Sequence, residues 1–262
     1  MLRPRIIPCL LVQDKGLVKT VQFKKPKYVG DPINAVRIFN EKQVDELTIL
    51  DIDATAQGRE PDYKMIEHWA SECRMPLCYG GGVKTPEQAQ RIFELGVEKI
   101  AISSAAIANP ELITKIAERV GSQSVVVVID VKKKLFGGYE VYTHNGKKAT
   151  GKNPFEFAKQ IQNLGAGEIV INSIDQDGVM KGYDMSLVEK VREVNTLPLT
   201  ILGGAGTLAD IGKLIEKFRI IGASAGSLFV FKGVYKAVLI NYPNPGEKDK
   251  LIQENFEFLK NK

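Results

Sequence analysis

Residues that build disulfide and metal sites are scarce in this sequence. The 262 residues include three cysteines, Cys9, Cys73 and Cys78, and two histidines, His68 and His144. An odd number of cysteines without metal-type spacing argues against both a disulfide framework and a zinc site. Neither histidine has a nearby acid or nucleophile in a recognisable pattern. The sequence therefore predicts no metal, no cofactor and a reducing, cytoplasmic environment.

Long apolar runs and clustered charge are lacking as well. No stretch is long enough to span a bilayer, and no apolar segment of the signal-peptide type is present near the N-terminus. The formal net charge of +5 is modest, and the lysines look scattered, without a basic stripe interleaved with aromatic residues. We therefore expect neither a membrane nor a nucleic acid as partner. A small anionic molecule suits the charge better.

What the sequence does contain is an internal repeat. Two short apolar runs end in glycine loops about 120 residues apart, at residues 79–83 and 201–206, and a helix start follows each loop. The runs at residues 99–106 and 220–227 follow the two loops at almost the same distance. This spacing indicates two half-units of similar structure.

The predicted elements alternate between strand and helix. Short runs rich in isoleucine and valine predict strands buried on both faces of a parallel sheet, and stretches that begin with a cap and proline and stop at glycine predict helices. The strands are expected near residues 5–11, 47–52, 76–80, 99–103, 124–130, 168–173, 198–202 and 220–225, and helices near 32–39, 86–95, 110–120, 154–164, 186–194 and 209–218. Eight strands alternating with helices predict an α/β fold, a single (β/α)8 barrel.

We expect this barrel to form one domain over residues 1–262. Its half-barrels are expected at about residues 1–120 and 121–240, followed by a polar tail at 241–262 with a short helix. One stretch breaks the alternation: residues 135–143 contain Gly137-Gly138 followed by the alternating Tyr139, Val141 and Thr143, and Asn145-Gly146 is a hairpin turn signal. This pattern predicts a small hairpin inserted after the fifth strand.

Residues at the carboxyl ends of barrel strands face the active site. Glycine loops and helix starts at these ends predict two phosphate pockets, on opposite sides of the barrel mouth. In the alternative interpretation the glycines only turn the chain. The first pocket would contain Gly82, Ser103 and Ser104, and the second Asp177, Gly178, Gly203, Gly204, Gly226 and Ser227.

Asp130 is the predicted acid–base residue. It ends an entirely apolar strand over residues 125–129, where a carboxylate is costly unless it meets a partner or water. The alternative is a structural acid paired with Lys132 or with a backbone amide.

Several stretches together resemble the cyclase subunit of imidazole glycerol phosphate synthase, the HisF family. They are residues 5–10, 80–83, 104–106, 125–130, 173–178 and 203–206, and the similarity runs through about residue 235. The resemblance implies a (β/α)8 barrel that binds a glutaminase subunit at its N-terminal face and receives ammonia through the barrel. The family uses this ammonia to close an imidazole ring and to release an aminoimidazole carboxamide ribonucleotide.

The resemblance also assigns roles to residues outside the phosphate pockets. It implies that Lys19 binds substrate and that Glu98 and Gln123 contact the glutaminase. A ring of alternating charges closes the bottom of the family's barrel as an ammonia gate, and the alternative here is four unrelated surface charges. The matching residues are Arg5, Glu46, Lys99 and Glu168.

The chain departs from the family at the chemistry itself. Where the family has an aspartate at the end of strand one, paired with the Asp130 position, this sequence has Leu11. Leucine cannot transfer a proton, and Asp53 is a candidate replacement carboxylate. Three functions stay open: a true cyclase of histidine biosynthesis, a non-catalytic scaffold that activates the glutaminase, or a paralogue in surface-polysaccharide synthesis. The paralogue, which Leu11 favours, would help make acetamidino sugars with a glutaminase and a separate amidotransferase.

Overall fold

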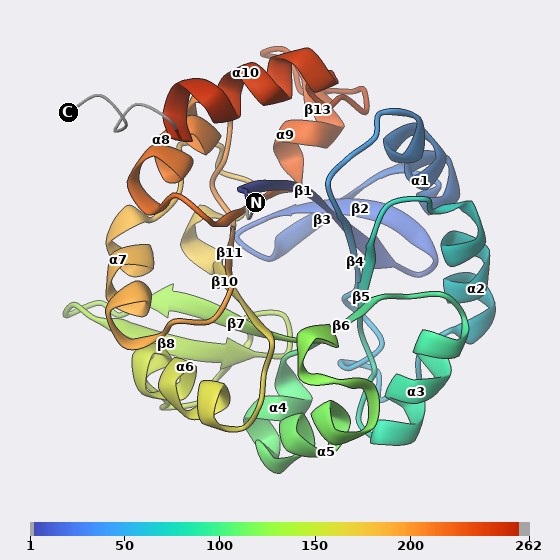
Figure 1. Ribbon diagram of the computed structural model, residues 1–262, viewed down its shortest axis with the longest axis vertical. Helices are drawn as coiled ribbons and strands as arrows, with labels where there is room; N and C mark the ends of the chain where they lie inside the picture. Colours follow the sequence, from blue (N-terminus) through green and yellow to red (C-terminus); the bar gives the residue numbers. More distant parts are fainter. Residues whose placement is uncertain (1–2, 257–262) are drawn as a thin grey trace.

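Eight parallel strands form the centre of the molecule and close into a barrel (Figure 1). The computed structural model describes residues 3–256 of the chain. The last strand pairs with the first, with Gly222 opposite Arg5, and this pairing closes the ring. The predicted (β/α)8 barrel is confirmed. Its strands, in order around the ring, are β1 (Arg5–Gln13), β4 (Leu47–Asp51), β5 (Leu77–Gly80), β6 (Lys99–Ile102), β7 (Val125–Lys133), β10 (Glu168–Ser173), β11 (Leu199–Leu202) and β12 (Gly222–Ala225).

Helices connect the strands and cover the outside of the barrel (Figure 1). They are α1 (Pro32–Glu41), α2 (Tyr63–Glu72), α3 (Pro86–Glu94), α4 (Ser104–Ala108), α5 (Glu111–Val120), α6 (Pro154–Asn163), α7 (Met185–Val194), α8 (Leu208–Phe218), α9 (Ser227–Val230) and α10 (Pro245–Phe256), with 3-10 turns η1 (Ser122–Ser124) and η2 (Ile174–Gln176). The sequence does not predict α2 or the short helices α4 and α9.

Side-chain caps explain where most of the predicted helices begin. Thr85 forms a reciprocal capping box with Gln88 at the start of α3, and Asn153 caps α6 through its side-chain oxygen. The expected start of α5 is wrong by one residue, because Pro110 rather than Asn109 occupies the cap position, without a side-chain hydrogen bond.

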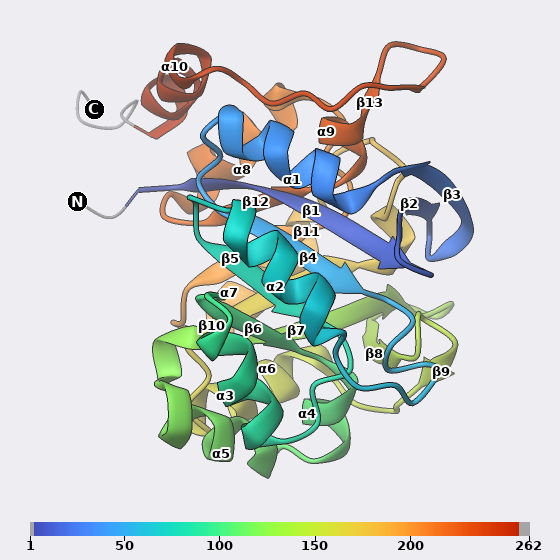
Figure 2. The same ribbon diagram turned by 90° about the vertical axis from the view of Figure 1, so that its right-hand side faces the viewer.

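Three antiparallel hairpins extend from the carboxyl ends of the barrel strands. They contain β2 (Gly16–Val21) with β3 (Lys24–Gly30), β8 (Tyr139–Thr143) with β9 (Lys148–Ala149), and β13 (Phe231–Lys232) with β14 (Ala237–Val238). Figure 2 shows all three at the same end of the barrel, which is its mouth. The predicted hairpin after the fifth strand is confirmed, and β7 runs past residue 130 because it pairs with β8.

The apolar core has two parts. The larger part lies between the barrel and its helices and includes the buried Phe39, Trp69 and Phe229. A smaller cluster of Cys78, Ala101, Val126 and Val128 is separate from it, with Leu50 and Val170 packed alongside. These six residues come from consecutive barrel strands, on the opposite side of each strand from the helices. They form the apolar interior of the barrel.

The chain ends are placed only in part. The predicted helix in the tail is found as α10, whereas residues 1–2 and 257–262 lie outside the described residues. The expected domain boundaries and the division into half-barrels near residue 120 stay predictions. Within residues 3–256, no helix is both long enough and apolar enough to cross a membrane.

Candidate active site

A cavity of about 480 Å³ lies at the mouth of the barrel. Loops at the carboxyl ends of the strands and two of the three hairpins at the mouth line it. All of the residues predicted to bind phosphate or substrate contribute to its wall, together with Asp130. They are Lys19, Gly82, Ser103, Ser104, Asp177, Gly178, Gly203, Gly204, Gly226 and Ser227. The structure therefore brings the predicted site together, while the binding role of each residue stays a prediction.

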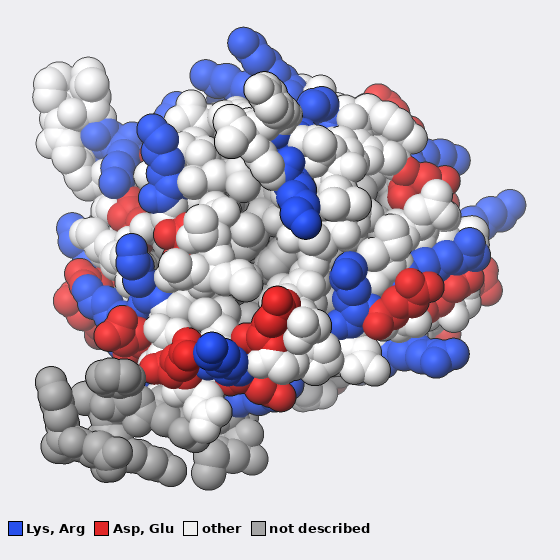
Figure 3. Space-filling view, turned by 90° about the horizontal axis from the view of Figure 1, so that it is seen from above, with Lys and Arg blue, Asp and Glu red and all other residues white. Residues whose placement is uncertain are grey.

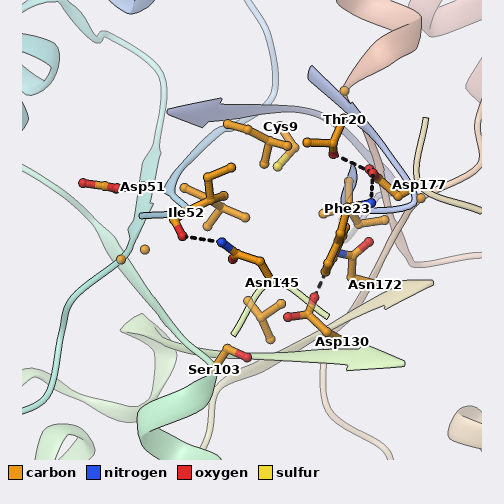
Figure 4. A pocket seen from close by; sticks show the side chains of 18 of the residues that line it. Cys9, Thr20, Phe23, Asp51, Ile52, Ser103, Asp130, Asn145, Asn172 and Asp177 are labelled. Atoms are coloured by element: carbon orange, nitrogen blue, oxygen red, sulfur yellow. Dashed lines mark hydrogen bonds between the residues drawn. The ribbon is translucent and has the colours of Figure 1, made fainter. Parts of the chain in front are cut away.

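Asp130 is held in this wall by the neighbouring strand. The β7–β10 register places Asn172 directly opposite it, and the Asn172 side-chain amide donates a hydrogen bond of 2.9 Å to its carboxylate (Figure 4). Burial raises the pKa of Asp130 to about 7, against the weaker effect of this hydrogen bond. The alternative partner, Lys132, instead lies over the Tyr142 ring. A carboxyl group with this pKa can take up or release a proton near neutral pH.

The opposite wall offers no equivalent acid. In the ring of eight strands β1 stands across from β7, and Leu11 of β1 presents an aliphatic side chain to the cavity. Asp53 does not replace the missing carboxylate, because its oxygens accept hydrogen bonds from Gln13 and from the backbone of Asp14, away from the cavity lining. The suggestion that Asp53 points into the mouth is wrong.

Two further carboxylates line the cavity, and both already have hydrogen-bond partners, Asp51 in its own loop and Asp177 in the β2–β3 hairpin. Asp51 accepts hydrogen bonds of 3.0 Å from the backbone amides of residues 53 and 54. Asp177 accepts a hydrogen bond of 2.6 Å from the Thr20 hydroxyl and another from the Phe23 backbone amide (Figure 4). Burial raises the pKa of both groups above the usual range. These contacts hold loops in place, so Asp130 is the carboxylate most available to a ligand.

Two polar atoms of the cavity wall await a partner. Among the described residues, the Ser103 hydroxyl and the Asn172 side-chain carbonyl are buried without a hydrogen bond. Both residues line the cavity close to Asp130 (Figure 4). Buried polar groups are nearly always satisfied, so these two atoms are suited to bind polar groups of a ligand.

Lys19 brings a buried cation to the second predicted phosphate pocket. Its side chain is 5% exposed, and its ammonium donates a hydrogen bond of 2.6 Å to the Cys9 carbonyl. Burial lowers its pKa, partly opposed by Cys9 and Asp177. A Cβ atom at Gly226 would lie 2.4 Å from the ammonium nitrogen, so glycine at this position leaves room for the lysine. The arrangement places a cation beside the Gly226-Ser227 turn.

Backbone packing accounts for other glycines of the site. Gly178 and Gly204 have φ angles of +66° and +121°, and a Cβ atom at either position would lie 2.1 Å from a backbone carbonyl oxygen. Their freedom of φ and lack of a side chain are therefore needed by the loops themselves. These contacts leave phosphate binding by the loops a prediction.

Two hairpins cover part of the cavity, and the sequence does not predict the first of them, β2–β3. Phe23, in the β2–β3 turn, and Asn145, in the β8–β9 turn, both line the cavity. The Asn145 amide donates a hydrogen bond of 2.9 Å to the Ile52 carbonyl across the mouth (Figure 4). No strong turn dipeptide marks the first hairpin, because its turn residues Gln22 and Phe23 adopt positive φ without glycine.

Four charged residues form a closed ring at the other end of the barrel. Arg5, Lys99 and Glu168 are the first residues of their strands, and Glu46 directly precedes β4. Each cation contacts both carboxylates: Lys99 lies 2.7 Å from Glu46 and 2.8 Å from Glu168, and Arg5 lies 2.7 Å from Glu168 and also pairs with Glu46. The interpretation as four unrelated surface charges is therefore wrong.

The carboxylates of the ring are buried, so the pKa values of Arg5, Lys99 and Glu168 depend on the charges of the other ring residues. Glu46 and Glu168 are each 4% exposed. Burial acts to lower the pKa of Arg5 and Lys99, but the two carboxylates outweigh it and raise both values. Burial acts to raise the pKa of Glu168, but the cations hold it below its usual range. All three groups therefore stay charged at neutral pH.

The ring has a fifth member that the sequence does not predict. The Thr200 hydroxyl, from β11, donates a hydrogen bond of 2.5 Å to Glu168. A Cβ atom at Gly222 would lie 1.9 Å from this hydroxyl oxygen, so the glycine leaves room for it. Threonine at a strand start carries no sequence signal of such a role, and only the β11–β12 register brings the two together.

The remaining predicted partner contacts lie at the same end as the charged ring. Glu98 is exposed and directly precedes β6, where its carboxylate accepts a hydrogen bond of 2.7 Å from the Leu77 backbone amide. Gln123 is exposed in η1, just before β7. That Glu98 and Gln123 contact a glutaminase stays a prediction. Within residues 3–256, no group of three or more His, Cys, Asp or Glu side chains is arranged to hold a metal ion.

Comparisons with known proteins identify the family of this chain. The family model described as "Histidine biosynthesis protein" matches residues 5–236. A protein of Vibrio vulnificus, provisionally named imidazole glycerol phosphate synthase subunit hisF3, is 63% identical over 254 residues, which cover 97% of this chain and 98% of the relative. The provisionally named hisF2 of Pseudomonas aeruginosa is 53% identical over 249 residues, covering 95% and 99%.

A relative named without that reservation is less similar. The imidazole glycerol phosphate synthase subunit HisF of Streptococcus sanguinis is 39% identical over 229 residues, which cover 87% of this chain and 91% of the relative. Identity and coverage of this extent place the whole barrel, including the cavity and the charged ring, within one family. The chain therefore belongs to the HisF family, the cyclase subunits of imidazole glycerol phosphate synthase.

Proposed function

We propose that this chain is a HisF-like synthase subunit that pairs with a glutaminase and passes ammonia through its barrel. The ammonia would serve to amidate a phosphorylated sugar or a nucleotide-sugar intermediate of surface-polysaccharide synthesis. One observation carries this proposal: Leu11 faces the cavity across from Asp130, where ring closure in the family uses a second carboxylate. The higher identity to the provisionally named subunits than to the HisF of S. sanguinis supports a separate branch.

The ammonia path begins at the charged ring. Opposite charges compensate one another there, so the ring adds little net field along the barrel axis. Beyond it, Cys78, Ala101, Val126 and Val128 form an apolar interior, and Ala101 and Val128 also line the cavity. Neutral ammonia crosses such an interior at far lower cost than ammonium, because a desolvated charge without a partner is expensive.

In the cavity, the available groups suit the addition of ammonia. When ammonia attacks an electrophilic carbon, the new amine nitrogen must lose a proton, and Asp130 with a pKa near 7 can accept it. The Ser103 hydroxyl and the Asn172 carbonyl are free to bind polar groups of the acceptor. Closure of an imidazole ring in this family requires a second acid–base group, which Leu11 does not supply.

A genuine cyclase of histidine biosynthesis is the second candidate. The complete set of predicted phosphate-binding residues around the cavity, together with Asp130, favours it. A barrel that only activates the glutaminase is a third outcome, in which the separate amidotransferase performs the chemistry. The three candidate functions predict different rates of cyclisation when ammonia and the family's substrate are supplied directly.

The decisive experiment mixes the purified protein with excess ammonia and the phosphoribulosyl-formimino substrate of the family. Release of the aminoimidazole carboxamide ribonucleotide is followed over time. We expect turnover at least a hundredfold below an ordinary rate of about one per second, because general acid–base help of that order is missing. Turnover near one per second would refute the paralogue function.

Two variants at one position separate a missing acid from a changed pocket. Leu11→Asp restores a carboxyl group, while Leu11→Asn introduces a polar side chain of the same size that cannot transfer the proton. An increase in cyclisation of tenfold or more with aspartate but not with asparagine would show a pocket that still fits the family's substrate. No increase with either variant supports an acceptor of different shape.

A further inference from the structure

The charge of this chain is divided between the two ends of the barrel. We call residues 14–30, 132–152 and 231–238 the rim hairpins, because they contain the three hairpins around the mouth. They hold thirteen lysines, no arginine and only two acidic residues, Asp14 and Glu140, for a net charge of +11. The whole chain carries +5, so the remaining residues carry −6. The lysines that look scattered in the sequence are gathered by the fold.

Most of these lysines are free of carboxylates. Among the described residues, Lys15 pairs with Asp62 at 3.5 Å and Lys133 with Asp184 at 3.0 Å, while the other rim lysines have no carboxylate within 4 Å. Figure 3 shows lysine and arginine side chains crowding the upper edge, which is the mouth end, and acidic side chains mostly toward the lower edge. The rim is therefore a cationic surface that its own chain does not neutralise.

Large apolar side chains project from the same hairpins. Leu135 and Phe136, in the β7–β8 turn, are 90% and 98% exposed, and Val234 and Tyr235, in the β13–β14 turn, are 94% and 97% exposed. Figure 1 places the two turns on different sides of the barrel axis, and Figure 2 places both at the mouth. Aromatic and aliphatic tips of this kind are typical anchors of a protein interface.

We propose that the rim hairpins dock the acidic face of the separate amidotransferase, which holds the acceptor against the mouth of this barrel. This inference rests on the proposed function, because it concerns where the ammonia leaves. A body seated on the rim touches both apolar tips and covers the cavity opening between them. Ammonia that left an uncovered mouth would be protonated and diluted in water, whereas a sealed junction delivers it to the acceptor. Lysines around the contact attract and orient the partner.

Two other classes of partner fit less well. A bilayer on the rim would cover the cavity entrance with hydrocarbon, which carries no acceptor for ammonia, whereas a protein that seals the mouth can bring the acceptor with it. Nucleic-acid sites usually use arginine for bidentate contacts with phosphate, and the rim hairpins contain none. An acidic protein with apolar pockets satisfies both the charge and the exposed tips.

The test uses the complex of this chain with its glutaminase. One variant combines Phe136→Ser with Tyr235→Ser, and a second combines Lys232→Glu with Lys236→Glu; none of these residues lines the cavity. The matched control reverses two exposed lysines on outer helices, Lys115→Glu in α5 and Lys159→Glu in α6. All six positions are exposed, so we expect each variant to fold.

Tagged wild type and variants are cross-linked in cells of the source organism, and captured proteins are identified by mass spectrometry. A protein that both rim variants lose and the control keeps is then purified. We expect its Kd for the wild-type complex to rise at least tenfold in each rim variant and with added salt. We also expect nitrogen from glutamine to reach the acceptor held by this partner only when the rim hairpins are unchanged.

Three results would overturn the docking surface. One is that the wild type retains no protein that the rim variants lose. Another is that the purified partner binds the rim variants as tightly as the wild type. The last is that phosphatidylglycerol vesicles or a single-stranded oligonucleotide, used as probes at about 0.15 M salt, bind the wild type and displace the partner. Glutaminase stimulation is measured in parallel: its absence in the wild type refutes the proposed function, and its retention in the rim variants shows that only docking was changed.

Discussion

Replacing Asp130 by asparagine should make the protein more stable at pH 8. The carboxyl group lies in the wall of the cavity, and burial raises its pKa to about 7. Its hydrogen bond comes from the Asn172 amide, which asparagine at position 130 can accept equally well through its own carbonyl oxygen. The substitution therefore removes the cost of a buried charge without leaving a donor unpaired.

The size and sign of the effect follow from proton linkage. An unfolded aspartate has a pKa of about 3.9, so between pH 4 and 7 the folded chain holds a proton that the unfolded chain has lost. The stability of the wild type thus falls as pH rises through this window and is level above it. Three pKa units correspond to at most about 4 kcal/mol, and access of water through the cavity reduces this to about 1–3 kcal/mol.

Urea unfolding at pH 4 and pH 8 measures this difference, with the single, buried Trp69 as fluorescence probe. We expect Asp130→Asn to exceed the wild type by about 1–3 kcal/mol at pH 8 and to match it near pH 4. The control is Asp249→Asn, an exposed aspartate expected to change stability by less than about 0.5 kcal/mol at either pH. An Asp130→Asn protein with no advantage at pH 8 would refute the reasoning.

Three further predictions concern the ring, the loops and the phosphate pocket. Glu168→Gln should lose about 3–5 kcal/mol in urea unfolding because two half-buried cations lose a buried partner, and a loss as small as that of the exposed Glu87→Gln would contradict it. Gly204→Ala should cost at least about 2 kcal/mol, clearly more than Gly58→Ala, because only the first adds a Cβ atom against a backbone carbonyl; equal losses would argue against this contact. Lys19→Met should abolish the rise in Tm that inorganic phosphate gives the wild type, and an undiminished rise would exclude Lys19 from phosphate binding.

The barrel could be predicted because each of its elements has a local cause. Apolar runs fix the strands, and caps such as Thr85 and Asn153 fix helix starts, so both are visible in a short window of sequence. The β2–β3 hairpin has no such cause. Its strands are rich in lysine, and its turn places Gln22 and Phe23 at positive φ, a conformation for which the sequence gives no glycine or asparagine signal.

The residues of the candidate site also differ in whether a local sequence signal predicts them. Asp130 and the glycine loops could be predicted, since each lies just after an apolar run that must be a barrel strand. Thr200 and Asn145 could not, because their roles depend on contacts between distant strands and loops. The prediction that Asp53 points into the cavity was also wrong. Its side chain instead faces the β1–β2 turn, which belongs to a hairpin that the sequence does not predict.

Leu11 and Asp130 differ in what they contribute to the stability of the fold. An aliphatic side chain in the cavity wall costs no desolvation, so leucine at position 11 is favourable to the fold. Asp130 is the opposite case: its raised pKa means that the folded chain is less stable with the ionised group than with a neutral one. Its contact with Asn172 would survive in asparagine, so the fold has no need of the carboxyl group. A residue that lowers stability and fills no structural need is best explained by chemistry. We therefore expect the cavity still to move a proton, as the proposed function requires, on a substrate that needs one acid–base group rather than two.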